Sequence, residues 1–296
     1  MKELFILPFD HRSSFLKKMF GVDGRQPTQE EVEKTKELKN LVYQGFKLAV
    51  TQGQVPKESA GILVDEQFGD GIIKDAVANN YKVCLSTEKS GQKEFDFEYG
   101  ENFGQHISKY KPTLVKALVR YNPDDNKDIN ARQIERLKQL SDFCVQNDYQ
   151  FIIEPLVPAT EEQLARVDGD QNRYDNELRP NLMVKMIEEM QAGGVEPDVW
   201  KIEGLEKSDD YKKLVDQIQT GGRNAKAIVL GRGADDSQVE KWLEAGAKVE
   251  GVIGFAVGRT IFWQSLVDYN EGKIDADKAV EQIAEKFTHF YKVFSK

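Results

Sequence analysis

The stretch Leu4-Phe5-Ile6-Leu7-Pro8-Phe9-Asp10-His11-Arg12 decides between two folds. It is typical of a short apolar strand that ends in polar residues, and no glycine-rich turn follows it. An open doubly wound sheet usually carries such a glycine turn after its first strand. The sequence therefore favours a closed (β/α)8 TIM barrel over an open α/β sheet.

Seven further apolar runs follow, and amphipathic segments separate them. This alternation predicts a parallel sheet, because parallel neighbours need a crossover and the crossover here is helical. The predicted strands are 4–10, 61–66, 82–86, 113–120, 150–155, 198–203, 227–231 and 252–256. The predicted helices include 30–52 (opened by a capping box at 28–31), 130–147, 182–192, 208–220, 237–245 and 276–294, with the segment 95–108 less clearly helical.

The chain has 296 residues, which is enough for one barrel of about 250 residues. No change of composition or Pro/Ser-rich linker divides it, so we predict a single domain over residues 1–296. The one long polar insertion, 156–180, follows the fifth strand. An insertion of this length is either a lid or binding loop, or a surface loop without a function.

Charge and composition exclude several function classes. Lys and Arg number 41 against 50 Asp and Glu, for a net charge of −9 without a long basic run, which argues against nucleic-acid binding. No apolar run approaches 18 residues and no signal peptide is present, so we expect a cytoplasmic protein without membrane contact. Cys84 and Cys144 are too few for a disulfide framework and are expected in the core. The sequence leaves open whether the chain forms a homo-oligomer.

Two lysines fall inside predicted strands, where lysine is uncommon and rarely buried. In a barrel, catalytic groups lie at the carboxyl ends of the strands. If Lys116 and Lys201 both face inward, strand alternation brings them together beside Glu154. Otherwise each lysine extends outward and pairs with a carboxylate on a helix.

A buried lysine in such a group is typical of Schiff-base catalysis. Its ordinary pKa of about 10.4 leaves it protonated, and lowering that pKa to about 7 requires roughly 4 to 5 kcal/mol from desolvation and a neighbouring cation. Lys116 would supply that cation for Lys201. Glu154 would move protons during bond cleavage.

Two glycine-arginine loops follow the last two predicted strands. They are Gly231-Arg232-Gly233 and Gly258-Arg259. The corresponding loops of barrels often bind phosphate through backbone N–H groups, and arginines match a phosphate dianion. The alternative is two tight turns with arginines in solvent.

The sequence favours a metal-independent reaction without a cofactor. Of His11, His106 and His289, only His11 falls at a strand end, whereas a zinc site needs several converging histidines. By residue type alone, a magnesium site formed by Asp10, Asp65, Glu66 and Glu154 stays open.

The opening motif Leu7-Pro8-Phe9-Asp10-His11-Arg12-Ser13-Ser14-Phe15 resembles that of the aldolase-like domain in bacterial inositol-catabolism kinase–aldolase fusions (5-dehydro-2-deoxyphosphogluconate aldolase-like, DUF2090). It is also similar to the class I tagatose 1,6-bisphosphate aldolases. The resemblance continues through Val64-Asp65, Phe68-Gly69, Lys116, Glu154-Pro155, the stretch 198–203, the stretch 230–233 and the stretch 258–263.

The resemblance implies a class I aldolase that forms its Schiff base on Lys201. Glu154 and Lys116 then match positions for proton transfer and charge, and Asp10 matches an active-site acid. The two glycine-arginine loops would hold the phosphate of the substrate. At the remaining strand ends we expect substrate contacts from Arg12, Asp65 and Glu203.

The implied substrate is 2-deoxy-5-keto-gluconate 6-phosphate, split into dihydroxyacetone phosphate and malonate semialdehyde. His11 and Ser13-Ser14 stand where the tagatose enzymes have Gln and Gly-Ala, which argues against a bisphosphate substrate. We expect a separate sugar kinase to supply the phosphorylated substrate. The other readings are a tagatose-bisphosphate-type aldolase, a phosphosugar isomerase or epimerase with Glu154 as base, and a non-catalytic sugar-phosphate sensor.

Overall fold

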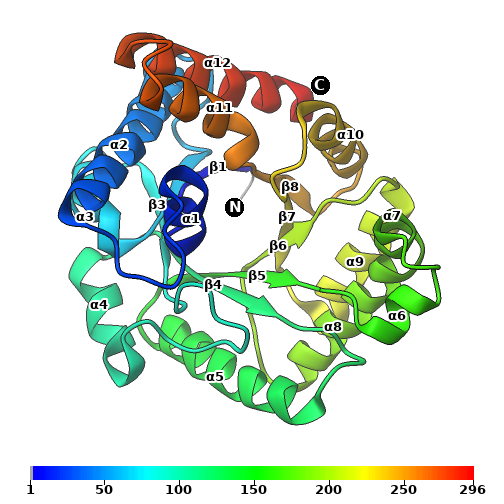
Figure 1. The fold of residues 1–296 in the computed structure, drawn as a ribbon. Helices are drawn as coiled ribbons and strands as arrows, with labels where there is room; N and C mark the ends of the chain where they lie inside the picture. Colours follow the sequence, from blue (N-terminus) through cyan, green and yellow to red (C-terminus); the bar gives the residue numbers. More distant parts are fainter. Residues whose placement is uncertain (1–2) are drawn as a thin grey trace.

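The computed structural model describes residues 3–296 and shows eight parallel strands closed into a barrel in chain order (Figure 1). Parallel pairing of the first and last strands closes the barrel, with Phe5 opposite Phe255. This confirms the predicted (β/α)8 fold, and every predicted strand is present within two residues of its expected bounds. The strands are β1 (Leu4–Pro8), β2 (Ala60–Val64), β3 (Lys82–Ser86), β4 (Leu114–Arg120), β5 (Gln150–Leu156), β6 (Val199–Glu203), β7 (Lys226–Leu230) and β8 (Val252–Ala256).

The helices surround the sheet (Figure 1). They are α1 (Ser13–Phe20), α2 (Gln29–Thr51), α3 (Glu66–Ala78), α4 (Phe103–Tyr110), α5 (Lys127–Gln146), α6 (Glu161–Ala165), α7 (Gln171–Arg173), α8 (Arg179–Ala192), α9 (Ser208–Ile218), α10 (Asp236–Ala247), α11 (Arg259–Asn270) and α12 (Ala276–Phe294). Short helical turns are η1 (Gly100–Asn102), η2 (Tyr174–Leu178, a π-helical turn) and η3 (Thr220–Gly222). No helix of residues 3–296 is both long enough and apolar enough to cross a membrane.

Local signals explain where several helices begin and end. The predicted capping box is present, because Glu31 N–H donates to Thr28 Oγ1 (3.2 Å) and Thr28 N–H donates to Glu31 Oε2 (2.7 Å). In the segment 95–108, only the part from Gly100 onward is helical. Helix α1, which was not predicted, ends at Gly21 in the left-handed conformation (φ 68°).

The barrel interior is apolar at its lower level and polar at its upper level. A cluster of small and branched side chains fills the lower level: Leu4, Ile6, Leu63, Cys84, Leu114, Ile152, Val199, Ile228, Ile253 and Ala256. On β4 and β6, the next inward positions after Leu114 and Val199 are the buried Lys116 and Lys201. The apolar level therefore forms the floor beneath the polar groups.

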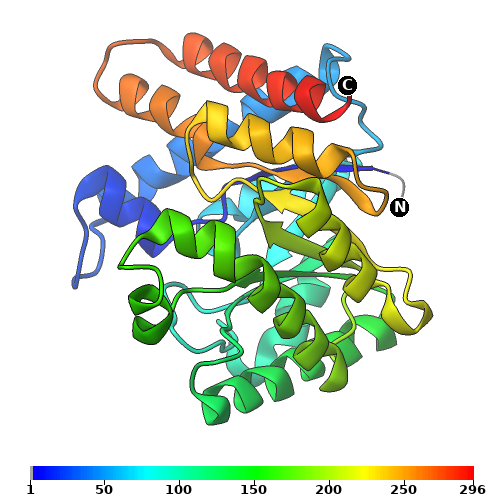
Figure 2. The same ribbon diagram turned by 90° about the vertical axis from the view of Figure 1, so that its right-hand side faces the viewer.

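Two segments stand on the carboxyl-end face of the barrel. Figure 2 shows the dark-blue α1 and the green segment with α6 and α7 on the side away from the N-terminus. The insertion 156–180 is thus not an open loop, since it folds into α6, α7 and the π-helical turn η2. Both segments border the mouth of the barrel.

A buried ion pair joins α2 to the end of β2. Lys39 on α2 binds the carboxylate of Asp65, and the two side chains are 0% and 1% exposed. The second carboxylate oxygen of Asp65 accepts a hydrogen bond from Phe68 N–H (2.8 Å) and so caps α3. Asp65 is therefore a structural residue of the barrel wall.

Replacing Asp65→Ala leaves Lys39 as an uncompensated buried charge and removes the cap of α3. The free energy of unfolding, measured in urea by circular dichroism, should fall by about 3–5 kcal/mol. Asp216→Ala on α9 is the matched control, because Asp216 pairs with Lys212 in solvent and its loss should cost less than about 1 kcal/mol. Equal losses in the two variants would contradict this assignment.

Candidate active site

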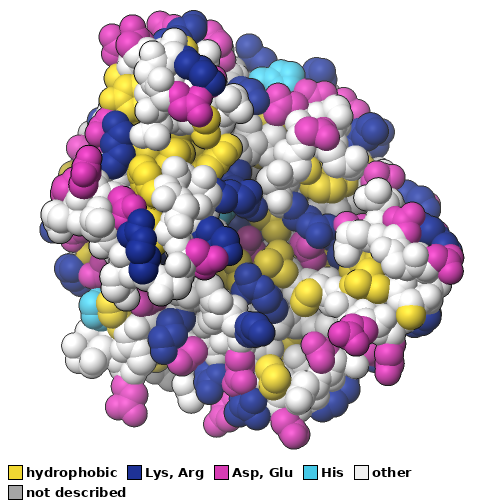
Figure 3. Space-filling view, viewed as in Figure 1, with side chains coloured by type: hydrophobic (Ala, Val, Ile, Leu, Met, Phe, Trp, Pro, Cys, Tyr) yellow, Lys and Arg dark blue, Asp and Glu magenta, His cyan; other side chains and the backbone are white. Residues whose placement is uncertain are grey.

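A cavity of about 660 Å³ opens at the carboxyl ends of the strands. Figure 3 shows the corresponding hollow at the centre of this face, with Lys and Arg side chains gathered around it. The cavity is lined by ends of β1 and β4–β8 and by the segments after β3 and β5. Every predicted site residue except Asp65 lines this cavity.

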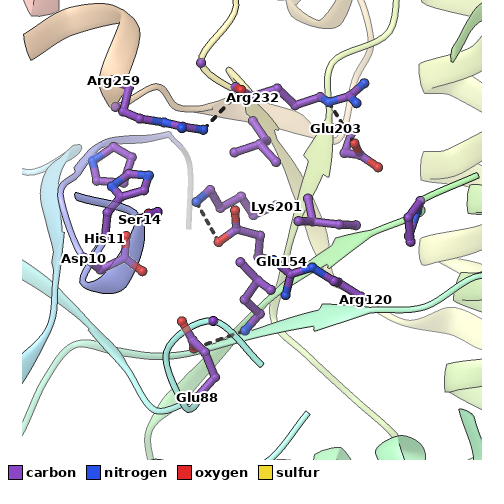
Figure 4. Close-up of a pocket in the computed structure, with 18 of the residues that line it drawn as sticks. Asp10, His11, Ser14, Glu88, Arg120, Glu154, Lys201, Glu203, Arg232 and Arg259 are labelled. Atoms are coloured by element: carbon purple, nitrogen blue, oxygen red, sulfur yellow. Dashed lines mark hydrogen bonds and ion pairs between the residues drawn. The ribbon is translucent and has the colours of Figure 1, made fainter. Parts of the chain in front are cut away.

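Glu154 bridges the two strand lysines. Its Oε2 lies 2.9 Å from Lys201 Nζ and 3.0 Å from Lys116 Nζ (Figure 4). All three side chains are nearly inaccessible to solvent. Both lysines therefore face the interior, and the alternative in which they extend outward toward helix carboxylates is wrong.

Lys116 has more carboxylate neighbours than Lys201. Besides Glu154, its Nζ lies 2.9 Å from Asp10 Oδ2 and 2.7 Å from Glu88 Oε1. Burial alone would lower the pKa of Lys116, but these three carboxylates hold it well above its usual range. Lys116 is thus a fixed cation, whereas Lys201 has Glu154 as its one ion-pair partner among residues 3–296.

The lysines in turn keep the carboxylates ionised. Burial raises the pKa of Asp10, but the Lys116 ammonium, with smaller contributions from His11 and Lys201, holds that pKa well below its usual range. Burial likewise opposes ionisation of Glu154, and the attraction of Lys116 and Lys201 outweighs it and lowers the pKa. At neutral pH the carboxylates of Asp10 and Glu154 are therefore ionised, and Glu154 lies directly beside Lys201.

The two glycine-arginine loops lie side by side at the rim. Thr260 Oγ1 donates to the carbonyl of Ala234 (2.7 Å), which fastens α11 to the loop after β7. Gly233 has a left-handed backbone (φ 71°), and a Cβ there would lie 3.0 Å from Arg259 Nη2. A Cβ at Gly258 would collide with the carbonyl oxygen of Pro8. The glycines thus leave room for Arg259 and for the tight contact between β8 and β1.

The two loop arginines have different surroundings. Among residues 3–296, the one hydrogen-bond partner of the Arg259 side chain is the backbone oxygen of Arg232, at 3.4 Å, and no side chain caps the N-terminus of α11. Arg232 instead pairs with Glu203 Oε1 (3.1 Å; Figure 4) and with Asp175 Oδ2 (2.8 Å). Arg259, at the uncapped N-terminus of its helix, is therefore better placed to receive an anion than Arg232.

Glu203 and Arg12 line the cavity but are already bound to protein groups. Glu203 Oε2 accepts a hydrogen bond from Val157 N–H (2.9 Å), which ties the start of the 156–180 segment to β6. Arg12 donates to Glu98 Oε2 (2.6 Å) and to the carbonyl of Glu88. Their geometry supports roles in shaping the cavity wall, in place of the direct substrate contacts that the sequence suggested.

The expectation that Asp65 contacts substrate is not supported by its position. The residue lies outside the cavity, because its carboxylate turns outward to Lys39 and to the N-terminus of α3. A carboxylate directly after a strand either faces the barrel mouth or caps the next helix. The carboxylate of Asp65, which follows β2, caps the next helix, α3.

Three cavity residues were missed as site candidates. Glu88 binds Lys116, and the inward alternation of β3 continued for two residues past Ser86 would have indicated it. Arg120 ends β4 and is exposed in the cavity. His11 has an Nδ1 that is buried without a hydrogen-bond partner among residues 3–296, and burial lowers its pKa to about 4.

The carboxylates considered for magnesium do not converge. Glu66 binds His106 and Lys109 on the outside, and Asp65 binds Lys39. Asp10 and Glu154 do meet, but around the ammonium of Lys116. No group of three or more potential metal ligands was found among residues 3–296.

Comparison with known proteins places the chain in a family. The model of the family described as "Uncharacterized protein conserved in bacteria (DUF2090)" matches residues 1–296. The chain belongs to this family. Two tagatose 1,6-diphosphate aldolases from strains of Staphylococcus epidermidis are 25% identical over 158 residues, which cover 51% of this DUF2090 chain and 44% of each relative. The match thus spans less than half the length of these curated relatives.

Solved structures share the fold of this DUF2090 protein. An archaeal fructose 1,6-bisphosphate aldolase gives a TM-score of 0.57 at 14% identity, covering 97% of this chain and 94% of that one. A Schiff-base-forming fructose-1,6-bisphosphate aldolase gives 0.55 at 14% identity, covering 96% and 94%. At such identities the likeness establishes the barrel alone.

The lowered pKa of Asp10 predicts how its contribution to stability depends on pH. The unfolded chain takes up a proton on Asp10 near pH 4, whereas the folded protein does so only at much lower pH. The stability that Asp10 contributes is therefore fully present above about pH 5 and declines as the pH falls below 4. Urea unfolding of wild type and Asp10→Asn should show a difference in stability that shrinks between pH 5 and pH 2.5. A constant or growing difference would contradict the assignment.

Proposed function

We propose that this chain is a metal-independent class I aldolase that forms a Schiff base on Lys201 and cleaves a carbon–carbon bond in a phosphorylated keto sugar or sugar acid. The observation that carries the proposal is the shared carboxylate of Glu154, 2.9 Å from Lys201 and 3.0 Å from Lys116. A buried amine beside a base and a fixed second cation is the arrangement that nucleophilic lysines need. The similarity to tagatose 1,6-diphosphate aldolases supports the same reaction class.

The first half of the proposed reaction forms the covalent intermediate. Glu154 accepts a proton from Lys201 Nζ, and the free amine attacks the substrate ketone. Glu154 then returns the proton to the carbinolamine hydroxyl, which leaves as water, and an iminium ion remains. Lys116 stays protonated throughout, because three carboxylates surround it. It thereby keeps Glu154 ionised at the start of each turnover.

The second half breaks the carbon–carbon bond. A carboxylate of the cluster, Glu154 or Asp10, takes the proton of the hydroxyl on the carbon that becomes the aldehyde. The bond to the neighbouring carbon breaks, and its electron pair moves to the iminium nitrogen to form an enamine. Protonation and hydrolysis of the enamine release the ketone product and restore Lys201.

The substrate we propose is 2-deoxy-5-keto-gluconate 6-phosphate, as in inositol catabolism. Its C5 ketone would meet Lys201, and its phosphate would lie at Arg259 and the 231–233 loop. Cleavage between C3 and C4 gives malonate semialdehyde and dihydroxyacetone phosphate. A kinase must install the phosphate before cleavage, and we propose that a separate protein does so.

Borohydride trapping tests the mechanism. Wild-type protein incubated with dihydroxyacetone phosphate and borohydride, with or without chelator, should acquire one reduced adduct that peptide mass mapping assigns to Lys201. Lys201→Met should form no adduct and should lower the cleavage rate at least about a thousandfold, because the nucleophile is gone.

Lys207→Met is the matched control, because Lys207 is exposed and precedes α9 outside the cavity. It should trap the adduct as the wild type does. Turnover at the wild-type rate in Lys201→Met would refute the Schiff-base mechanism. A protein that binds the phosphate and exchanges the substrate's carbon-bound proton, yet forms no adduct, would be an isomerase or epimerase. Binding without either reaction would identify a sensor.

A further inference from the structure

Arg120 is a cavity cation that the proposed reaction does not use. It is the last residue of β4, and its side chain is exposed within the lining of the cavity. Its Nη1 donates to the carbonyl of Gln92 at 2.7 Å, which holds one edge of the guanidinium against the segment after β3. Guanidinium carries five N–H donors, so the remaining ones are available to a ligand.

Two of the four cavity arginines have no carboxylate partner among residues 3–296. Arg12 pairs with Glu98, and Arg232 pairs with Asp175 and Glu203. Arg120 and Arg259, by contrast, contact only backbone oxygens. An arginine held in place by a carbonyl keeps its full charge for an incoming anion.

The barrel places these two arginines on opposite sides of Lys201. Arg259 opens the helix after β8, and Arg120 ends β4; in a closed eight-stranded barrel, these two strands are diametrically opposed. Figure 4 shows Lys201 and Glu154 between Arg259 on one side and Arg120 on the other. A ligand that reaches both guanidinium groups must pass over the nucleophile.

The central carboxylates make this separation necessary. At the centre of the cavity, the carboxylates of Asp10, Glu88 and Glu154 outnumber the ammonium groups of Lys116 and Lys201, so an anionic group of the ligand is attracted more strongly to the rim than to the centre. Each end of the ligand therefore needs its own cation. Arg259 is the cation available near β8, and Arg120 is the one available near β4.

We infer that Arg120 forms a second anion subsite, which binds the carboxylate at the end of the substrate opposite to the phosphate. This inference rests on the proposed function and adds the residue that selects a sugar acid phosphate over an uncharged sugar phosphate. The planar guanidinium matches a carboxylate through two parallel hydrogen bonds. Arg120 thus determines specificity and takes no part in the proton transfers.

The test compares two six-carbon ligands that differ only at the distal end. 6-Phosphogluconate carries a carboxylate where glucitol 6-phosphate carries a hydroxymethyl group, and neither contains a ketone for Lys201. Calorimetry should show that the wild type binds 6-phosphogluconate about tenfold more tightly. Arg120→Gln should remove that preference and leave the affinity for glucitol 6-phosphate within about twofold.

Arg132→Gln is the matched control, since Arg132 is exposed and pairs with Glu94 outside the cavity. It should keep the wild-type preference. Equal affinities of wild type for the two ligands, or a preference that survives in Arg120→Gln, would overturn the subsite. Borohydride trapping of dihydroxyacetone phosphate separates the two proposals: Arg120→Gln should still form the Lys201 adduct. A subsite that fails while the adduct forms leaves the aldolase mechanism standing.

Discussion

The site depends on one electrostatic constraint: the Lys116 ammonium, buried in the barrel, must be neutralised by carboxylates, and one of these, Glu154, also pairs with Lys201. Burying either sign of charge alone is costly, and the cluster offsets that cost only when all members are present. Glu154 belongs to both lysines, so the position of the nucleophile follows from the position of the fixed cation. Chemistry and local stability are coupled through that one carboxylate.

Much of this arrangement could be predicted from sequence, because strand alternation has a period of two. A lysine within an apolar strand, as in Leu114-Val115-Lys116-Ala117-Leu118, faces either the barrel interior or the helices. The inward orientation is favoured for Lys116 and Lys201 because Glu154 is then close enough to pair with both. The eight strands were predictable because each is a short apolar run that helical patterns separate from the next. The closed barrel then brings their carboxyl ends together.

The remainder depends on contacts that no local pattern encodes. Asp65 and Asp10 both follow apolar strands, yet Asp65 turns outward because Lys39, distant in sequence, offers an ion pair there. The prediction that Arg232 binds phosphate overlooked Asp175, whose approach depends on how the 156–180 segment folds back over the rim. Helix α1 went unpredicted because eight residues carry too little periodicity to stand out.

The pairing of β1 with β8 determines when the ligand pocket forms as the chain folds. Gly258 packs against Pro8, and the ends of the first and last strands are aligned only when the two strands pair. A nascent chain still lacking β8 therefore has no complete ligand pocket, however well its earlier strands have formed. A tight-binding substrate analogue would then stabilise finished barrels selectively, and it would act as a marker for successful closure in cells or in refolding mixtures.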